Sequence, residues 1–231
     1  MKAVLFDAVD TLLRPWPSVG AVYARAAAAG GTRCRAQALE AAFRPAYREL
    51  FPERFFGRSA LQTSEARERR WWARVLARTF ERAGCGRPDT AVLAAGVEAF
   101  ARGNAWRPVK GAVETLRTLA ARGLKIALVS NYDSRLHRVA AELGLAPFFD
   151  AVIVSSEVGW AKPSPRIYAA ALDALGVAPG EALMVGDRLR EDVAGARAAG
   201  LGALLYDPRG HAPGPGSVRD LRQVQRRLPA A

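Results

Sequence analysis

Short polar clusters follow several apolar runs of this sequence, and their residue types suit phosphoryl transfer. The clusters are Asp7-Ala8-Val9-Asp10-Thr11, Ser130-Asn131, the loop around Lys162, and Asp187 with Glu191 and Asp192. A carboxylate can attack phosphorus, hydroxyl and ammonium groups can hold phosphoryl oxygens, and further carboxylates can bind a hard divalent cation. This set of groups predicts covalent transfer of a phosphoryl group to an aspartate.

The first three clusters have separate expected roles. Asp7 is the natural nucleophile, and Mg²⁺ together with Lys162 would neutralise the repulsion between this carboxylate and an anionic phosphate. Ser130 and nearby backbone amides would donate hydrogen bonds to the phosphoryl oxygens. We expect Asn131, the next residue, to bind the substrate.

The fourth cluster is expected to bind the metal. Asp187 would anchor Mg²⁺ together with either Glu191 or Asp192, while the remaining carboxylate of this pair would cap the following helix. The sequence does not decide between the two. Isolated Asp, Ser and Lys residues more often stabilise turns or face solvent, so the joint spacing of the clusters carries the functional interpretation.

The elements that must position these groups follow from the apolar pattern. Five continuously apolar runs predict buried parallel strands, at 3–8, 126–130, 152–155, 183–186 and 203–206. Amphipathic stretches between the later runs predict helices at 112–121, 135–143, 165–175 and 192–199. The fold class is therefore α/β, and open α/β sheets place their sites at the carboxyl ends of the strands.

The segment 15–106 departs from this alternation, because it contains no predicted strand and consists of successive helical stretches. We interpret it as an inserted helical domain, with residues 1–14 and 107–231 forming the core. Residues 14–105 contain 16 arginines and eight acidic residues, so the insertion carries most of the excess positive charge. That charge fits either a solvated surface or a lid that attracts anionic substrate. Trp16, Tyr23 and Arg58 are candidates for substrate contact.

The order of these motifs resembles the haloacid dehalogenase-like hydrolases, a superfamily dominated by phosphatases. Asp7 matches the family's nucleophile, Thr11 its first-loop threonine, Ser130 its second motif, Lys162 in Lys-Pro-x-Pro its third, and Gly186-Asp187 with Glu191-Asp192 its acidic fourth. The resemblance implies a Rossmann-like core with its strands in the order 5-4-1-2-3, a helical cap inserted after the first motif, and Mg²⁺ as cofactor.

The first motif departs from the family pattern Asp-x-Asp-Gly-Thr. Val9 occupies the position of the second aspartate, which in the family protonates the leaving oxygen and then activates water. A positioned acid or base of this kind contributes roughly 10² to 10⁴-fold. The backbone carbonyl of Val9 could still bind magnesium, as the resemblance implies. Asp10 is a possible substitute acid and base, although a shift of one residue near a strand end reverses the side-chain direction.

Three functions are therefore compatible with the sequence. The favoured one is a phosphatase that acts on a small phosphorylated metabolite. The lack of the second aspartate should slow hydrolysis least for substrates with good leaving groups. The second is a metal-independent haloacid dehalogenase, which also lacks the second aspartate, although the acidic cluster disfavours it. The third is a catalytically silent protein that binds phosphoryl groups.

Composition excludes other classes. The 30 arginines and four lysines give a net charge of +12, yet no recognition motif or basic run accompanies them, so nucleic-acid binding is disfavoured. No apolar run is long enough for a bilayer, and we expect a soluble cytoplasmic monomer or homodimer without a membrane partner. Cys34 and Cys85 form no CxxC pair and are expected to be reduced thiols. Val218, Leu221, Val224 and Leu228 predict a C-terminal helix.

Overall fold

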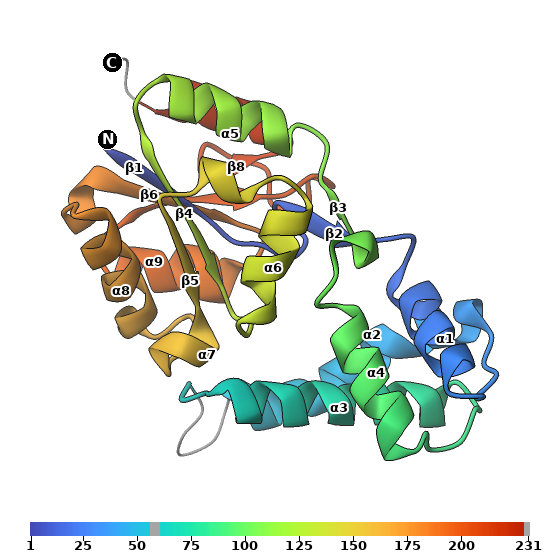
Figure 1. Cartoon of the computed structure of the whole chain (residues 1–231). Helices are drawn as coiled ribbons and strands as arrows, with labels where there is room; N and C mark the ends of the chain where they lie inside the picture. The colour runs from blue at the N-terminus through green and yellow to red at the C-terminus, as the bar shows by residue number, and fades with distance from the viewer. Residues whose placement is uncertain (56–60, 229–231) are drawn as a thin grey trace.

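The computed structural model describes residues 1–55 and 61–228, with the backbone alone for residues 52–55. Its centre is a six-stranded parallel sheet in the order β5-β4-β1-β6-β7-β8 (Figure 1). The strands are β1 (Ala3–Phe6), β4 (Lys125–Ser130), β5 (Ala151–Val154), β6 (Ala182–Gly186), β7 (Gly202–Tyr206) and β8 (Ser217–Val218). The α/β class is confirmed, and the five predicted strands lie in the predicted order. The short edge strand β8 was not predicted.

The sheet is apolar on both faces, which explains why its strands read as continuous apolar runs. Val4 and Phe6 of β1 belong to the core cluster that includes residues of α5 (Ala112–Ala121) and α6 (Arg135–Glu142). Leu5 belongs to the cluster on the opposite face, with residues of α8 (Pro165–Leu175) and α9 (Gly195–Ala198). Because β1 is buried on both faces and paired on both edges, the residues that follow it are held firmly.

The insertion, as we name the segment between β2 and β3, contains four α-helices within its described residues. They are α1 (Val19–Ala29), α2 (Ala36–Phe55), α3 (Glu65–Arg82) and α4 (Thr90–Ala99). An antiparallel pair of short strands, β2 (Leu13–Pro15) and β3 (Trp106–Pro108), joins the insertion to the core (Figure 1). This pair was not predicted. The two-domain division at residues 14–15 and 106–107 stays a prediction.

The insertion helices pack closely where small residues allow it. The backbone of Gly20 in α1 touches α2 so tightly that an added Cβ would overlap the carbonyl oxygen of Ala36 and the backbone of Glu40. The Glu40 carboxylate also accepts a hydrogen bond of 2.7 Å from the Gly20 amide. This contact fixes the angle between α1 and α2, and so the direction in which the later residues of α2 project.

The two cysteines form a disulfide, so the expectation of reduced thiols was wrong. Cys34 lies between α1 and α2, and Cys85 follows α3, with their Cα atoms 5.8 Å apart. The helical packing of the insertion brings together two loops that are 51 residues apart in sequence. A search for local CxxC spacing cannot detect such a pair. The cysteines therefore give no support to the predicted cytoplasmic location, which stays a prediction.

The C-terminal segment follows the predicted apolar spacing only in part. Val218 belongs to β8, Leu221 begins a single 3₁₀ turn, and the helix α10 (Val224–Arg227) is one turn long. Val218, Leu221, Val224 and Leu228 are nevertheless all buried against the core. Within the described part of the chain, no helix combines the length and the apolar character that a membrane span requires.

Candidate active site

Asp7 is placed by the strand that precedes it. β1 ends at Phe6, and the Asp7 amide donates a hydrogen bond of 2.9 Å to the carbonyl of Val185 in the neighbouring strand β6. The side chain is mostly buried, with 8% of the residue exposed. Asp7 is therefore held at the carboxyl edge of the sheet, where parallel α/β folds place their sites.

Lys162 reaches Asp7 from a loop 155 residues away. Its Nζ lies 2.7 Å from Oδ1 of Asp7 and 2.6 Å from Oδ1 of Asp192, and it also donates to the carbonyl of Val129 at 2.8 Å. Only 1% of Lys162 is exposed. Burial alone would lower the pKa of Lys162, but the charges of Asp192 and Asp7 outweigh burial and raise that pKa above its usual value. The ammonium group is therefore a fixed positive charge beside Asp7.

Asn131 holds the loop that carries Lys162. Its Oδ1 accepts from the backbone amide of Lys162 at 2.6 Å, and its Nδ2 donates to the Lys162 carbonyl at 3.0 Å. These two bonds give Asn131 a positioning role, and the predicted role in substrate binding stays a prediction. Ser130, the last residue of β4, is buried and lines the same cavity as Asp7 and Lys162.

Three carboxylates gather at this edge of the sheet. Oxygen atoms of Asp7, Asp187 and Asp192 lie within 4.8 Å of one another. Burial and the neighbouring charge of Asp7 raise the pKa of Asp187 to about 8. Gly186 makes this proximity possible, because a Cβ at that position would overlap the Asp192 carboxylate.

The cluster fits a divalent cation by its chemistry. Carboxylate oxygens are donors that suit Mg²⁺, and a bound cation would offset the repulsion among these three carboxylates. Asp192 is already engaged, since Oδ1 contacts Lys162 and Oδ2 accepts from the Arg188 amide at 3.0 Å. Burial raises the pKa of Asp192 to about 6, against the opposing effect of Lys162. Asp7 and Asp187 are thus the carboxylates with the most freedom to hold Mg²⁺.

The choice between Glu191 and Asp192 as metal ligand stays a prediction, but the structure places the two side chains differently. Asp192 belongs to the carboxylate cluster, whereas Glu191 lines the cavity and is not part of that cluster. Both lie in the π-helical turn η4 (Leu189–Ala194), and the hydroxyl of Tyr168 donates to the Glu191 carbonyl. Thr11 is fully buried, and its hydroxyl donates to Oδ1 of Asp187 at 3.4 Å. The first and fourth motifs are therefore linked directly.

Val9, which replaces the second aspartate of the first motif, and Asp10, its candidate substitute, also lie in this site. Val9 lines the cavity and packs partly against the apolar core. Asp10 adopts a left-handed backbone with φ of 67°, and its amide donates to the Leu13 carbonyl at 2.7 Å. β1 ends at Phe6, so the alternation of side-chain direction along a strand does not extend to Asp10. The exposed side chain of Asp10 lines the cavity. Desolvation by nearby atoms raises the pKa of Asp10, against the opposing charges of Arg44 and Arg188.

The site opens into a cavity of about 320 Å³ that extends from the core into the insertion. Its core wall includes Asp7, Ser130, Lys162 and Arg188, and its insertion wall includes Tyr23, Phe43, Arg44, Tyr47, Phe51, Trp72 and Phe100. Of the sequence candidates for substrate contact, Tyr23 lines the cavity, Trp16 is not among its lining residues, and Arg58 lies outside the described residues.

The aromatic wall of the cavity was not predicted, although the sequence contains a signal for it. Phe43, Tyr47 and Phe51 are spaced four residues apart in α2, and this spacing places them on one helix face. Arg188 was not predicted either, and its guanidinium lies 5.7 Å from the centre of the Tyr47 ring. Arg188 follows β6, so this contact joins the fourth motif to the insertion.

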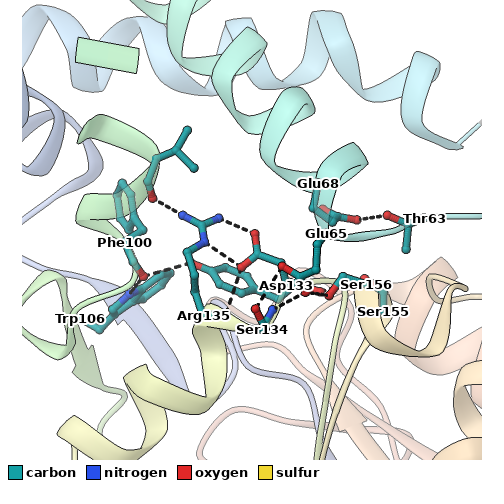
Figure 2. Close-up of polar contacts among 12 residues, drawn as sticks. Thr63, Glu65, Glu68, Phe100, Trp106, Asp133, Ser134, Arg135, Ser155 and Ser156 are labelled. Carbon is teal, nitrogen blue, oxygen red and sulfur yellow. Dashed lines mark hydrogen bonds and ion pairs between the residues drawn. The ribbon is translucent and has the colours of Figure 1, made fainter. Parts of the chain in front are cut away.

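Polar contacts hold the start of α3 against the core (Figure 2). The Glu65 carboxylate accepts from the amide and hydroxyl of Ser134, at 2.9 and 3.1 Å, and from the hydroxyl of Ser156. Burial would raise the pKa of Glu65, but these hydrogen bonds outweigh it and lower that pKa. Close to this point the Ala161 amide donates to the Leu61 carbonyl at 2.7 Å. The insertion therefore contacts the loop that carries Lys162.

A second junction lies on α4. Arg135 forms a buried, two-point ion pair with Asp133, and its guanidinium also donates to the carbonyl of Val97 (Figure 2). The Trp106 indole and the Tyr132 hydroxyl both donate to the carbonyl of Phe100, at 3.0 and 3.2 Å. These contacts satisfy carbonyl groups at the C-terminal end of α4 and just beyond it, where carbonyl groups lack partners within the helix.

The fold and the site together define the class of protein. A family model described as haloacid dehalogenase-like hydrolase matches residues 1–200. The chain belongs to this family, and the resemblance inferred from the motifs is confirmed.

Individual relatives extend over most of the chain. Human haloacid dehalogenase-like hydrolase domain-containing protein 3 is 38% identical over 212 residues, covering 89% of this chain and 81% of the human protein. Phosphoserine phosphatase of Thermus thermophilus is 40% identical over 242 residues, covering 96% of this chain and 95% of that protein. Among solved structures, L-2-haloacid dehalogenase from Xanthobacter autotrophicus has a TM-score of 0.74 and 26% identity, with 98% of this chain and 97% of that chain covered.

Proposed function

We propose that the protein is a Mg²⁺-dependent phosphatase that forms an aspartyl-phosphate on Asp7 and acts on a small phosphorylated metabolite. The observation that carries this proposal is the buried ammonium group of Lys162, 2.7 Å from Asp7 and 2.6 Å from Asp192. A charge in this position can neutralise both the nucleophile and the phosphate that approaches it. Relatives named as phosphatases, including the Thermus thermophilus protein, support the same proposal.

The proposed reaction has two steps. An Asp7 oxygen forms a bond to phosphorus while the bond from phosphorus to the leaving oxygen breaks. Water then attacks phosphorus, which releases inorganic phosphate and restores the Asp7 carboxylate. Ser130 and Lys162 would hold the phosphoryl oxygens, and Asn131 would keep Lys162 in place. Mg²⁺ on Asp7, Asp187 and the Val9 carbonyl would supply positive charge against the phosphate, and Thr11 would orient Asp187.

Val9 limits which substrates react well. No carboxylic acid occupies this position, so the leaving oxygen must depart without a proton or take one from Asp10 or water. Substrates whose leaving groups are stable as anions should therefore react fastest. We also propose that residues 15–106 form a cap domain over a core of residues 1–14 and 107–231, and that this cap selects the group attached to phosphorus.

A metal-independent 2-haloacid dehalogenase is the second candidate. The similarity to the Xanthobacter autotrophicus dehalogenase favours it, as does the absence of an acid at Val9. In that reaction an Asp7 oxygen would displace halide from carbon, and water would hydrolyse the resulting ester. The cluster of Asp7, Asp187 and Asp192 favours the phosphatase, because halide displacement gives such a cluster no function.

Phosphate release with and without Mg²⁺ tests the proposal. The purified protein is incubated with acetyl phosphate, phenyl phosphate, O-phosphoserine and 2-chloropropionate, and phosphate and chloride are measured. We expect phosphate release that requires Mg²⁺ and that Asp7→Asn abolishes. Asp150→Asn is the matched control, because Asp150 accepts from the Ile126 amide next to β5, away from the cavity. Chloride release without metal would establish the dehalogenase instead, and phosphonate binding without any turnover would establish a silent binding protein.

A further inference from the structure

The insertion wall of the cavity is a connected row of aromatic rings. Tyr23 contacts Phe100 edge to face with ring centroids 5.4 Å apart, and Phe43 at 6.2 Å. Phe43 is 6.1 Å from Tyr47, which is 5.7 Å from Phe51. These separations lie in the range of favourable aromatic pairs, so each ring helps to hold its neighbours in place.

The row remains incompletely covered by the rest of the protein. Phe43, Tyr47 and Phe51 are half-buried, whereas Tyr23 and Phe100 at the other end of the row are buried. All three rings line the cavity that contains Asp7 and Lys162. An apolar group attached to a phosphate at Asp7 could therefore pack against this aromatic surface. The cavity volume of about 320 Å³ lies at the small end of the range for ligand sites, so the group should be small.

Positive charge lies beside this aromatic surface. The Arg188 guanidinium is 5.7 Å from the Tyr47 ring centroid, and Arg44 lines the cavity one residue after Phe43. A guanidinium group stays charged in proteins, so Arg188 brings a positive charge to the cavity that it lines. A phenolic oxygen, which gains negative charge as its bond to phosphorus breaks, is the kind of group that such cations stabilise. The attached ring can also lie against a guanidinium group.

The absence of a carboxylic acid at position 9 also favours an aryl leaving group. A phenol has a pKa of about 10, like the tyrosine side chain, whereas the pKa of an aliphatic hydroxyl is far higher and close to that of water. An aryl oxygen can therefore depart as an anion without the acid that Val9 replaces. Building on the proposed phosphatase function, we propose that the substrates are aryl phosphates, with the ring seated among Phe43, Tyr47 and Phe51 and the phosphate on Asp7.

Two phosphate esters separate ring binding from leaving-group chemistry. Acetate is a better leaving group than phenolate, so chemistry alone makes acetyl phosphate the faster substrate. If the ring is bound as proposed, kcat/KM with Mg²⁺ should be at least tenfold higher for phenyl phosphate than for acetyl phosphate, and higher still relative to O-phosphoserine. A preference for acetyl phosphate or O-phosphoserine, with Mg²⁺-dependent turnover intact, would overturn the aryl proposal and leave the phosphatase function standing.

A matched pair of variants locates the ring. Phe43→Leu should lower the phenyl to acetyl ratio about fivefold, as expected for the loss of one aromatic partner. Phe149→Leu is the control, because Phe149 is also half-buried against the same core cluster and does not line the cavity. Thermal unfolding of both variants checks that they fold. The proposal would be overturned if Phe43→Leu left the phenyl to acetyl ratio unchanged, or if both variants lowered that ratio equally.

Binding supplies a measurement that does not depend on turnover. With Mg²⁺ present, calorimetry should show phenylphosphonate binding at least tenfold more tightly than methylphosphonate, and Phe43→Leu should reduce this difference. Tighter binding of phenylphosphonate without hydrolysis of any phosphate ester would support the aromatic site and refute the phosphatase function. Equal affinities for the two phosphonates would overturn the aromatic site.

Discussion

The two ends of the cavity are built in different ways. At the core end, Asp7, Asp192 and Lys162 form a buried ionic network with contacts of 2.6 and 2.7 Å. At the insertion end, Phe43 and Tyr47 are half-buried and contact their neighbours through ring edges and faces. A buried ion pair tolerates little displacement, because separating its charges in a poorly solvated site is costly. Each aromatic contact is weaker, at about 0.5–1.5 kcal/mol beyond its buried area.

This difference predicts a division of labour. Under the proposed function, the core end would contact the phosphate, which every substrate shares, whereas the insertion end would contact the part that differs between substrates. Changes at the core end should therefore slow all substrates by a similar factor. Changes at the insertion end should alter the ranking of substrates.

Replacing Lys162 should have the largest effect after loss of the nucleophile. In Lys162→Met, Asp7 and Asp192 face one another without the intervening cation, and the phosphate loses its nearest positive charge. We expect kcat/KM to fall about 10³-fold, which corresponds to the loss of one strong electrostatic contact in a transition state. The fall should be equal for phenyl phosphate and acetyl phosphate in a phosphate-release assay.

Lys125→Met is the control for this prediction. Lys125 begins β4 at the opposite edge of the sheet, and its ammonium group donates to the Leu175 carbonyl. Thermal unfolding of both variants separates lost catalysis from lost folding. A Lys162→Met effect that differs more than threefold between the two substrates would contradict the proposed division.

Restoring an acid at position 9 should have a smaller and selective effect. Val9→Asp would supply a proton to poor leaving groups, so hydrolysis of O-phosphoserine should rise about 10 to 10²-fold while phenyl phosphate changes little. Val9→Asn is the matched control, because it has nearly the same size and cannot donate a carboxylic proton. An equal response of both variants would mean that polarity or packing at Val9 limits the rate. No response in either would mean that Asp10 or water already delivers the proton.

The core end could be predicted from the sequence because the geometry of a parallel sheet fixes it. Asp7, Ser130 and Asp187 each follow an apolar run, and parallel strands bring such positions to one edge. The contact of Asp7 with Lys162 joins residues 155 positions apart, and motif order alone was enough to expect it. Element boundaries also followed from local patterns, since α5 and α8 have the predicted limits.

The insertion end could not be predicted because local patterns do not fix how helices meet. Phe43, Tyr47 and Phe51 show helical spacing, but such a face is equally suited to the interior of a helical bundle. Cys34 and Cys85 pair only because the bundle brings two distant loops together. The amide of Asn131 illustrates the same limit within the core, because only the structure shows it bonded to the Lys162 backbone.

The smallest expected effect concerns the stability of the core end and its dependence on pH. Burial and the charge of Asp7 raise the pKa of Asp187 to about 8, compared with about 3.9 in an unfolded chain. Between these pH values the native protein retains a proton that the unfolded chain has released. The unfolded state therefore binds fewer protons, and the free energy of unfolding of the metal-free protein falls as pH rises from about 4 to 8 through this group.

Mg²⁺ should reverse this trend, because it binds the ionised carboxylates and removes their repulsion. Its stabilising effect should grow as pH rises toward 8, since less free energy is then spent on displacing the Asp187 proton. At saturating Mg²⁺ we expect the Tm to rise by about 5 °C at pH 8 and by less than half of that at pH 6. Asp187→Asn should abolish the increment, whereas Asp150→Asn should retain it. Equal increments at both pH values would show that Asp187 is ionised throughout, and the core end would then bind its cation without releasing a proton.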